Sequence, residues 1–366
     1  ELSFEDAVKC FKEQIKGLMA GGVDLLVIET MMDIQETRAA VIAAKETCDL
    51  PIWVSVSFSE DGRTLTGTDP LTALITLQNL GADVVGCNCS AGPDTMVPFI
   101  EAMKPYAKVP LIAKPNAGLP CLQDGCTVFD MNETAFANHC VTLAKAGANL
   151  IGGCCGTNPG YIRLLAEKLS GLPPAPVSDR QGCRISSAQS TAVFDAAAGT
   201  AIIGERINPT GKKAFQSELR EGRMDTLRQM ALSQARDGAA VLDVNVGMGG
   251  VDEAALMGKA VCELATLTPA PLCIDTSDPA VAEAALRIYP GRALLNSISL
   301  EPARVNEMLP VAAKYGAALI LLPLDETGIP ETVEQRKALI SKLYDTVSEY
   351  GYTKEDILID GLAMAV

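Results

Sequence analysis

Three cysteines are the residues whose type and spacing most directly suggest chemistry. Cys154 and Cys155 are adjacent in a glycine-rich run (residues 152–157), and Cys89 ends a second short run (residues 86–89). Successive side chains of a regular strand point to opposite faces, so two adjacent thiols can face one ion only at an irregular strand end, which glycine permits. Zinc prefers thiolate ligands. The pattern predicts a zinc site formed by Cys89, Cys154 and Cys155.

Other cysteines have simpler interpretations. Cys87 lies two residues before Cys89 and so shares its strand face, which fits a small core residue. Cys121 and Cys126 could form another metal or redox site, but their spacing matches no familiar pattern, and packing or incidental thiols are the preferred interpretation. His139 is the only histidine and lies in a helical pattern, so we expect it on a helix surface or in a core.

One pattern repeats along the chain: a helical stretch, a glycine turn, and an apolar run that ends in a polar or sulfur residue. A glycine just past a helix suits the left-handed conformation, and an apolar run suits a strand buried on both faces. The glycines of this pattern are Gly22, Gly81, Gly147, Gly238 and Gly316. Five strands are expected before residue 172, at 25–30, 52–58, 84–89, 111–115 and 150–154. Six are expected after it, at 201–205, 241–246, 272–275, 293–298, 319–324 and 357–360.

Alternating strands and helices predict parallel sheets, and eight such units close a barrel. A proline-rich and serine-rich stretch (residues 173–195) separates the two sets of strands. We therefore predict two TIM-type (β/α)8 barrels in tandem, each incomplete in this chain of 366 residues. The first barrel covers residues 1–172, residues 173–195 form a linker, and the second barrel covers residues 196–366.

In such barrels, the residues at the carboxyl ends of the strands build the site. The first set of strands is rich in thiols there, and the second in carboxylates and amides. Besides the cysteines, the strand ends supply these candidate binding residues: Glu29, Asn116, Arg206, Asn208, Asp243, Asn245, Asp275, Asn296 and Asp360. For Asp243 or Asn245 alone, turn formation at a strand end is the simpler interpretation; the whole set together favours a ligand site.

Composition limits the function classes. The formal net charge is −15, so a nucleic-acid or anionic-membrane partner is not expected. No apolar run is long enough for a membrane span, and the first residues lack the pattern of a signal peptide. Twelve cysteines spread along the chain fit reduced thiols and metal binding. We expect a cytoplasmic protein.

Residues 1 to about 170 resemble the homocysteine-binding domain of the zinc-dependent homocysteine methyltransferases. The runs 86–89 and 152–157 match the two cysteine motifs of that family. The resemblance implies Cys89, Cys154 and Cys155 as zinc ligands with homocysteine sulfur in the fourth position. It also places Glu29 on the substrate side, where it would hold the ammonium group. A buried salt bridge is the alternative role for Glu29.

The second half resembles the pterin-binding barrel of dihydropteroate synthases and methyltetrahydrofolate-corrinoid methyltransferases. The motifs are Ile203–Gly211, Leu242–Asn245, Cys273–Thr276 and Leu295–Ser297. By position, this resemblance implies that the pterin ring is bound by Asp275, Asn296 and Asp360.

Together the resemblances imply a methyltransferase that passes a methyl group from 5-methyltetrahydrofolate to homocysteine, giving methionine and tetrahydrofolate. In multidomain enzymes of this order, a cobalamin on another module carries the methyl group. That module has an Asp-x-His-x-x-Gly motif, which this sequence lacks, so the cobalamin-binding domain or subunit would be a partner. The alternatives are another methyl donor, a pterin domain that makes dihydropteroate, or a truncated module that binds zinc or folate without turnover.

Overall fold

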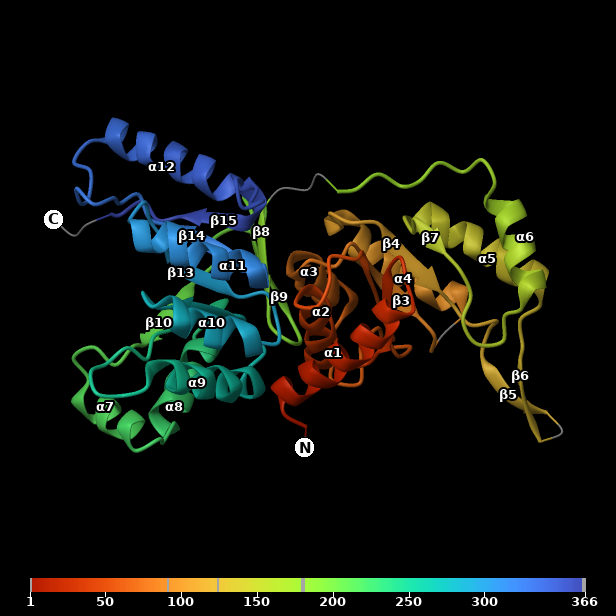
Figure 1. The fold of residues 1–366 in the computed structure, drawn as a ribbon, viewed down its shortest axis with the longest axis horizontal. Helices are drawn as coiled ribbons and strands as arrows, with labels where there is room; N and C mark the ends of the chain where they lie inside the picture. Colours follow the sequence, from red (N-terminus) through yellow and green to blue (C-terminus); the bar gives the residue numbers. More distant parts are fainter. Residues whose placement is uncertain (1, 91, 124, 179–181, 364–366) are drawn as a thin grey trace. The chain divides into compact units, whose positions relative to one another are not determined.

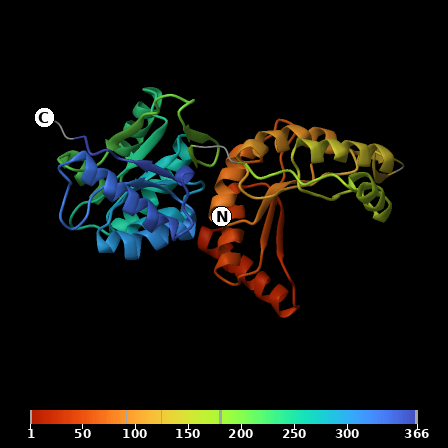
Figure 2. The same cartoon turned by 90° about the horizontal axis from the view of Figure 1, so that it is seen from above.

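The computed structural model describes residues 2–90, 92–123, 125–178 and 182–363. It divides into two compact units, one ending at Arg180 and the other beginning at Gln181. In each unit, helices flank a parallel sheet (Figures 1 and 2). Among the described residues, no helix combines the length and the apolar character needed to cross a membrane.

The first unit contains a five-stranded parallel sheet in the order β1-β2-β3-β4-β7. Its strands are β1 (Leu26–Met31), β2 (Ile52–Val56), β3 (Val84–Asn88), β4 (Leu111–Lys114) and β7 (Leu150–Ile151). Its helices are α1 (Phe4–Ala20), α2 (Ile34–Lys45), α3 (Pro70–Leu80), α4 (Pro93–Met103), η1 (Lys104–Tyr106), α5 (Glu133–Ala146) and α6 (Pro159–Leu169). All five strands expected from the sequence are present.

The second unit contains a six-stranded parallel sheet in the order β10-β11-β12-β13-β14-β15. Its strands are β10 (Ile203–Ile207), β11 (Val241–Val244), β12 (Leu272–Asp275), β13 (Leu294–Ile298), β14 (Ala318–Leu321) and β15 (Ile357–Ile359). Its helices are α7 (Lys213–Arg220), α8 (Asp225–Arg236), α9 (Glu253–Leu267), α10 (Pro279–Ile288), η2 (Arg304–Met308), α11 (Leu309–Tyr315), α12 (Val333–Ser348) and η3 (Lys354–Asp356). The six expected strands are likewise present.

Local chemistry explains where these helices begin and end. At the start of α3, the Asp69 side chain accepts a hydrogen bond from the N–H of Thr72, and Pro70 occupies the first turn. The same helix ends at a glycine in the left-handed region. All five glycines of the repeated pattern have positive φ, as predicted: Gly22 (79°), Gly81 (108°), Gly147 (124°), Gly238 (93°) and Gly316 (67°).

Both sheets have their strands in chain order, which is the order of a TIM-type barrel; a doubly wound sheet reverses its order part-way. Neither sheet closes among the described residues: β1 pairs with β2 alone, and β15 with β14 alone. Exposed apolar side chains mark these edges, with Val27 45% and Ile359 49% exposed. Each unit is thus an open segment of a TIM-type barrel, and the prediction of incomplete barrels is confirmed.

The stretch 173–195, which we expected to be a linker, contains an antiparallel hairpin of β8 (Cys183–Ser186) and β9 (Thr191–Phe194). Cys183 and Ile185 are buried in one hydrophobic cluster with Val241, Leu294 and Ala318, which lie at the starts of their strands. The hairpin therefore packs at the amino-terminal end of the second sheet, opposite the end where a barrel site forms.

A second hairpin, β5 (Pro120–Gln123) and β6 (Cys126–Phe129), projects from the first unit (Figure 1). Cys121 pairs with Val128, and Gln123 pairs with Cys126. Since alternate residues share a face, the two cysteines lie on the same face of the hairpin, and both are exposed. They lie on a different element from the predicted zinc ligands.

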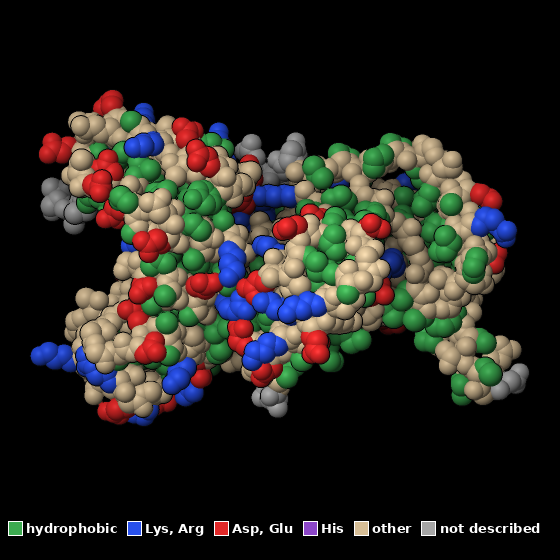
Figure 3. Space-filling view, viewed as in Figure 1, with side chains coloured by type: hydrophobic (Ala, Val, Ile, Leu, Met, Phe, Trp, Pro, Cys, Tyr) green, Lys and Arg blue, Asp and Glu red, His purple; other side chains and the backbone are tan. Residues whose placement is uncertain are grey.

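On the face drawn in Figure 3, acidic and basic side chains lie interspersed. Several basic groups of the first unit are paired, such as Lys12 with Glu46 at 2.6 Å and Lys9 with Asp6 at 3.2 Å. Mixed surface charge of this kind agrees with the absence of a basic cluster in the sequence.

Candidate metal and pterin sites

The three predicted zinc ligands converge at the carboxyl ends of β3 and β7. The Sγ atoms of Cys89, Cys154 and Cys155 all lie within 4.8 Å of one another. The Sγ atoms of Cys89 and Cys155 are 3.9 Å apart. A tetrahedral zinc ion with bonds of about 2.3 Å needs sulfurs about 3.8 Å apart, so this donor set fits zinc after a small contraction.

The backbone at Cys89 is bent out of the strand. Its φ of 61° is in the left-handed region, which is uncommon for a residue with a side chain. Its N–H donates to the carbonyl of Lys114 at 3.1 Å, so the residue stays anchored to β4. The bend takes Cys89 out of the alternating side-chain pattern of the strand, so its sulfur lies next to that of Cys155.

The loop that carries the other two thiols is also held by the end of β4. The N–H of Cys154 donates to the carbonyl of Pro115 at 2.8 Å, and the N–H of Cys155 donates to Oδ1 of Asn116 at 3.1 Å. Two glycines are required here: Gly156 has φ +80°, and a Cβ on Gly153 would lie 2.4 Å from Oγ1 of Thr157. Gly152 meets neither condition.

The electrostatics of this cluster favour a bound cation. Burial raises the pKa of the Cys155 thiol to about 11, and the neighbouring Cys89 and Cys154 add to the shift. Three thiolates this close repel one another unless a cation lies between them. Cys87, by contrast, is fully buried and its pKa is raised to about 12 by burial, so the core role predicted for it agrees with the structure.

The two candidate substrate residues of the first unit have partners. Glu29, at the end of β1, pairs with the ammonium of Lys114, and its side chain is 52% exposed. Asn116 is 4% exposed and its Oδ1 is occupied by Cys155, so it supports the cysteine loop. Lys114 was not among the residues predicted from the sequence. Its position as the last residue of β4 could have identified it as a candidate.

Asn88 is a second residue that the sequence analysis missed. It is fully buried at the end of β3, and its Nδ2 lies 3.8 Å from Sγ of Cys154. Its position between two cysteines was the signal that could have drawn attention to it.

In the second unit, four predicted residues come together at the ends of β11, β12 and β13. Asn245 donates from Nδ2 to Oδ2 of Asp275 at 3.0 Å. Asn296 donates from Nδ2 to Oδ1 of Asp243 at 3.3 Å. Asn245 also accepts from the N–H of Gly247 in a turn, so the turn interpretation and the cluster hold together.

Both carboxylates of this cluster sit in unfavourable surroundings. Burial raises the pKa of Asp243, and the charges of Asp275 and Glu205 raise it further. Burial also raises the pKa of Asp275. Desolvated carboxylates with amides beside them suit a ligand edge that offers several N–H donors.

Three predicted residues lie outside this cluster. Arg206 is on the helical side of β10, where its guanidinium is 3.7 Å from Asp237. Asn208 accepts from the N–H of Thr210 in a turn. Asp360 lies two strands from β13, at the end of β15, and accepts from the N–H of Leu362.

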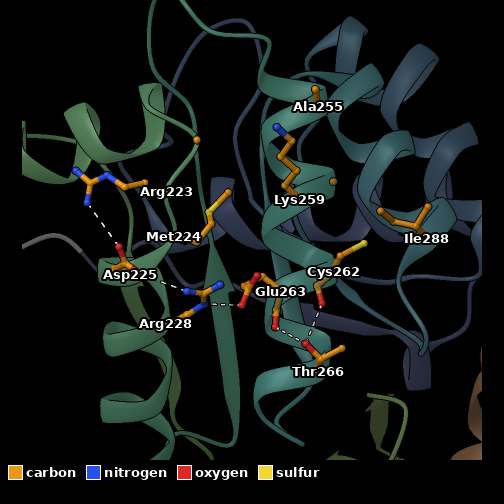
Figure 4. A pocket seen from close by; sticks show the side chains of 12 residues that line it. Arg223, Met224, Asp225, Arg228, Ala255, Lys259, Cys262, Glu263, Thr266 and Ile288 are labelled. Carbon is orange, nitrogen blue, oxygen red and sulfur yellow. Dashed lines mark hydrogen bonds and ion pairs between the residues drawn. The ribbon is translucent and has the colours of Figure 1, made fainter. Parts of the chain in front are cut away.

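A groove of about 640 Å³ lies between α8 and α9 (Figure 4). Arg228 joins its two sides, with Nε 2.5 Å from Glu263 and Nη1 3.3 Å from Asp225. None of the candidate residues lines this groove, so it is separate from the cluster of Asp243, Asn245, Asp275 and Asn296.

Each half of the chain matches a known protein family. Residues 1–169 match the Homocysteine S-methyltransferase family, and residues 204–365 match the Pterin binding enzyme family. The chain is 30% identical to the methionine synthase of Mycobacterium tuberculosis over 370 residues, which is 97% of this chain and 31% of that protein. The Mycobacterium leprae methionine synthase is also 30% identical, over 375 residues and the same shares. The chain thus spans about a third of the length of these relatives.

Solved structures with similarity to parts of the chain include the metallated Escherichia coli homocysteine methyltransferase MmuM, with a TM-score of 0.38 and 22% identity over 46% of this chain and 53% of that one. Another is the 7,8-dihydropteroate synthase of Vibrio fischeri, with a TM-score of 0.37 and 18% identity over 50% of this chain and 68% of that one. By these matches, residues 1–169 are similar to the homocysteine S-methyltransferase family and residues 204–365 are similar to the pterin-binding enzyme family.

Proposed function

We propose that this chain is the substrate-binding portion of a methionine synthase: the first unit binds homocysteine on zinc and the second binds 5-methyltetrahydrofolate. The observation that carries the proposal is the convergence of three thiols within 4.8 Å at the strand ends of the homocysteine methyltransferase domain. The family matches and the 30% identity to methionine synthases support it.

On the homocysteine side, Cys89, Cys154 and Cys155 would hold zinc through three thiolates. Zinc bound there would keep a substrate thiol deprotonated at neutral pH. Glu29 would orient the substrate by accepting from its ammonium group. Its carboxylate would then accept from two cations, the substrate ammonium and Lys114, which already contacts it.

On the folate side, the cluster of Asp243, Asn245, Asp275 and Asn296 would bind the pterin edge. The carboxylates accept from ring N–H groups, and the amides can either donate or accept. Arg206, Asn208 and Asp360 stay in the proposal as outer contacts, and each has a present partner: Asp237, Thr210 and Leu362, respectively.

We further propose that cobalamin on another module carries the methyl group between the two units. The cysteine cluster lies at the strand ends of one sheet and the pterin cluster at those of another, so each half-reaction has its own binding site. Reduced thiols at an exposed zinc site fit the cytoplasm, where cysteines stay reduced.

Zinc analysis of single-cysteine variants tests the metal assignment. We expect one zinc per wild-type chain and loss of most of it in Cys154→Ser and Cys155→Ser, because each removes one of three thiolates. Cys10→Ser is the matched control, since Cys10 is an exposed thiol of α1 outside the cluster. Unchanged zinc in both cluster variants would contradict the site. Zinc and folate binding without methyl transfer to added cobalamin would instead favour the binding-module alternative.

A further inference from the structure

The amide of Asn88 links the end of β1 to the cysteine cluster through four hydrogen bonds. Oδ1 accepts from the N–H of Thr30 at 2.8 Å and from Oγ of Ser55 at 2.7 Å. Nδ2 donates to Oγ1 of Thr30 at 2.8 Å and to Sγ of Cys154 at 3.8 Å. An asparagine side chain has two acceptor and two donor positions, so this buried amide is fully used.

The orientation of the amide follows from its partners. The backbone N–H of Thr30 can only donate, so the atom of Asn88 that faces it must be the oxygen. The nitrogen is then fixed on the other side, and one of its two hydrogens points toward Cys154. The sulfur of Cys154 therefore receives a hydrogen bond that holds it in place beside the amide.

The same amide also holds a bent backbone. Thr30 has φ 61°, in the left-handed region that a β-branched residue rarely adopts. Its N–H and Oγ1 are both tied to Asn88. Thr30 follows Glu29, the proposed substrate contact, so one side chain sets the positions of both the substrate strand end and one metal ligand.

We propose that Asn88 is a positioning residue for the metal site: it donates to the sulfur of Cys154 and joins that ligand to the β1 end that carries Glu29. This inference rests on the proposed zinc site. Partners that orient a metal ligand typically change metal affinity by about 10- to 100-fold when they are removed.

Asn88→Asp is the sharpest variant, because aspartate has the same shape and keeps both acceptor bonds but cannot donate to sulfur when ionised. We expect zinc affinity, measured by competition with a chelator on the full chain, to fall by about 10-fold or more. The sulfur-to-cobalt charge-transfer band of the cobalt-substituted protein should shift as well, because the Cys154 ligand loses its donor.

Ser57→Ala is the matched control. Ser57 is 3% exposed, and its hydroxyl donates to the backbone carbonyl of Asn88 at 2.8 Å. The substitution therefore removes a buried hydrogen bond of the same residue but leaves the contact with the Cys154 sulfur in place. Its zinc affinity and cobalt spectrum should match the wild type. Thr30→Val provides a second variant if Asn88→Asp fails to fold. It removes the hydroxyl that accepts from Nδ2 of Asn88 and leaves the amide itself intact. We expect a smaller fall in zinc affinity than for Asn88→Asp.

The outcomes separate this inference from the proposed function. If wild-type protein binds no zinc, the proposed metal site fails. If it binds zinc and the Asn88→Asp and Thr30→Val variants bind it with wild-type affinity and an unchanged cobalt spectrum, the role of Asn88 is overturned while the site stands.

Discussion

At the scale of single residues, the proposed pterin site formed by Asp243, Asn245, Asp275 and Asn296 would bind its ligand through carboxylates whose burial lowers the stability of the fold. Burial raises the pKa of Asp243 and of Asp275 above the ordinary aspartate value. Because the pKa is raised in the folded state, the ionised carboxylate destabilises the fold. The stability that the protonated form contributes is fully present below the pKa of the unfolded chain and is lost as pH rises through the pKa of the folded state.

Asp243→Asn should therefore stabilise the second unit at neutral pH, because it removes a buried charge, while weakening folate binding. The gain in stability over the wild type should shrink as pH falls through the raised pKa of Asp243, because the wild-type carboxylate then takes up a proton. Urea unfolding at several pH values measures this. Asp325→Asn is the control, because hydrogen bonds from Thr327 lower the pKa of Asp325 and its replacement should bring no gain. A gain for Asp243→Asn that grew as pH fell would contradict the assignment.

Asn296→Ala should weaken 5-methyltetrahydrofolate binding without changing zinc content. Losing a hydrogen bond to a buried ligand edge costs about 1–3 kcal/mol, which is roughly 5- to 150-fold in Kd. Calorimetry with the folate and metal analysis of the same sample give both quantities. Unchanged folate affinity with reduced zinc would show that the two sites are not independent.

The positions of the three cysteines and of Asp243, Asn245, Asp275 and Asn296 at or near strand ends could be predicted from the sequence, because position in or after an apolar run is a local property. The sequence could not place Arg206, whose direction depends on which face of β10 meets α8. Nor could it identify Asn88, whose role depends on Thr30 and Ser55, more than thirty residues away.

At the scale of elements, the parallel strands were predictable from apolar runs and post-helix glycines, but the β8–β9 hairpin was not. Serine-rich composition suggested a linker, yet Ser186 is buried because distant groups satisfy it: its Oγ accepts from the N–H of Arg292 and its carbonyl accepts from the hydroxyl of Tyr289. Such pairing cannot be inferred from local composition.

Arg292 anchors this hairpin. Its Nη1 donates to the carbonyl of Arg184 at 2.9 Å, and its Nη2 lies 2.7 Å from Oδ1 of Asp356. Arg292→Met would leave the buried Asp356 without its counter-ion, which should cost the second unit about 3–5 kcal/mol. Lys314→Met, which breaks the half-exposed pair with Glu283, should cost less than about 1 kcal/mol.

Calorimetric or circular-dichroism unfolding measures these losses. Trp53, the only tryptophan, lies in β2 of the first unit, so its fluorescence should report an unfolding transition that Arg292→Met leaves unchanged. Equal losses for the two variants would show that the Arg292 network does not anchor the hairpin.

At the scale of the whole molecule, the two proposed binding sites belong to separate sheets, and the proposed methyl transfer would use a carrier between them. We expect no methionine from 5-methyltetrahydrofolate and homocysteine with this chain and zinc alone. Each half-reaction should become measurable when free cobalamin is added. Sustained methionine formation without a corrinoid would mean direct transfer and would remove the need for a carrier.

In the proposed metal site, three cysteines hold a zinc ion whose fourth position accepts the substrate sulfur. X-ray absorption at the zinc edge of the full chain, with and without homocysteine, tests it most directly. We expect three sulfur ligands at about 2.3 Å without substrate and four with it. A count that stays at three when homocysteine is saturating, or zinc bound mainly by nitrogen and oxygen, would contradict it.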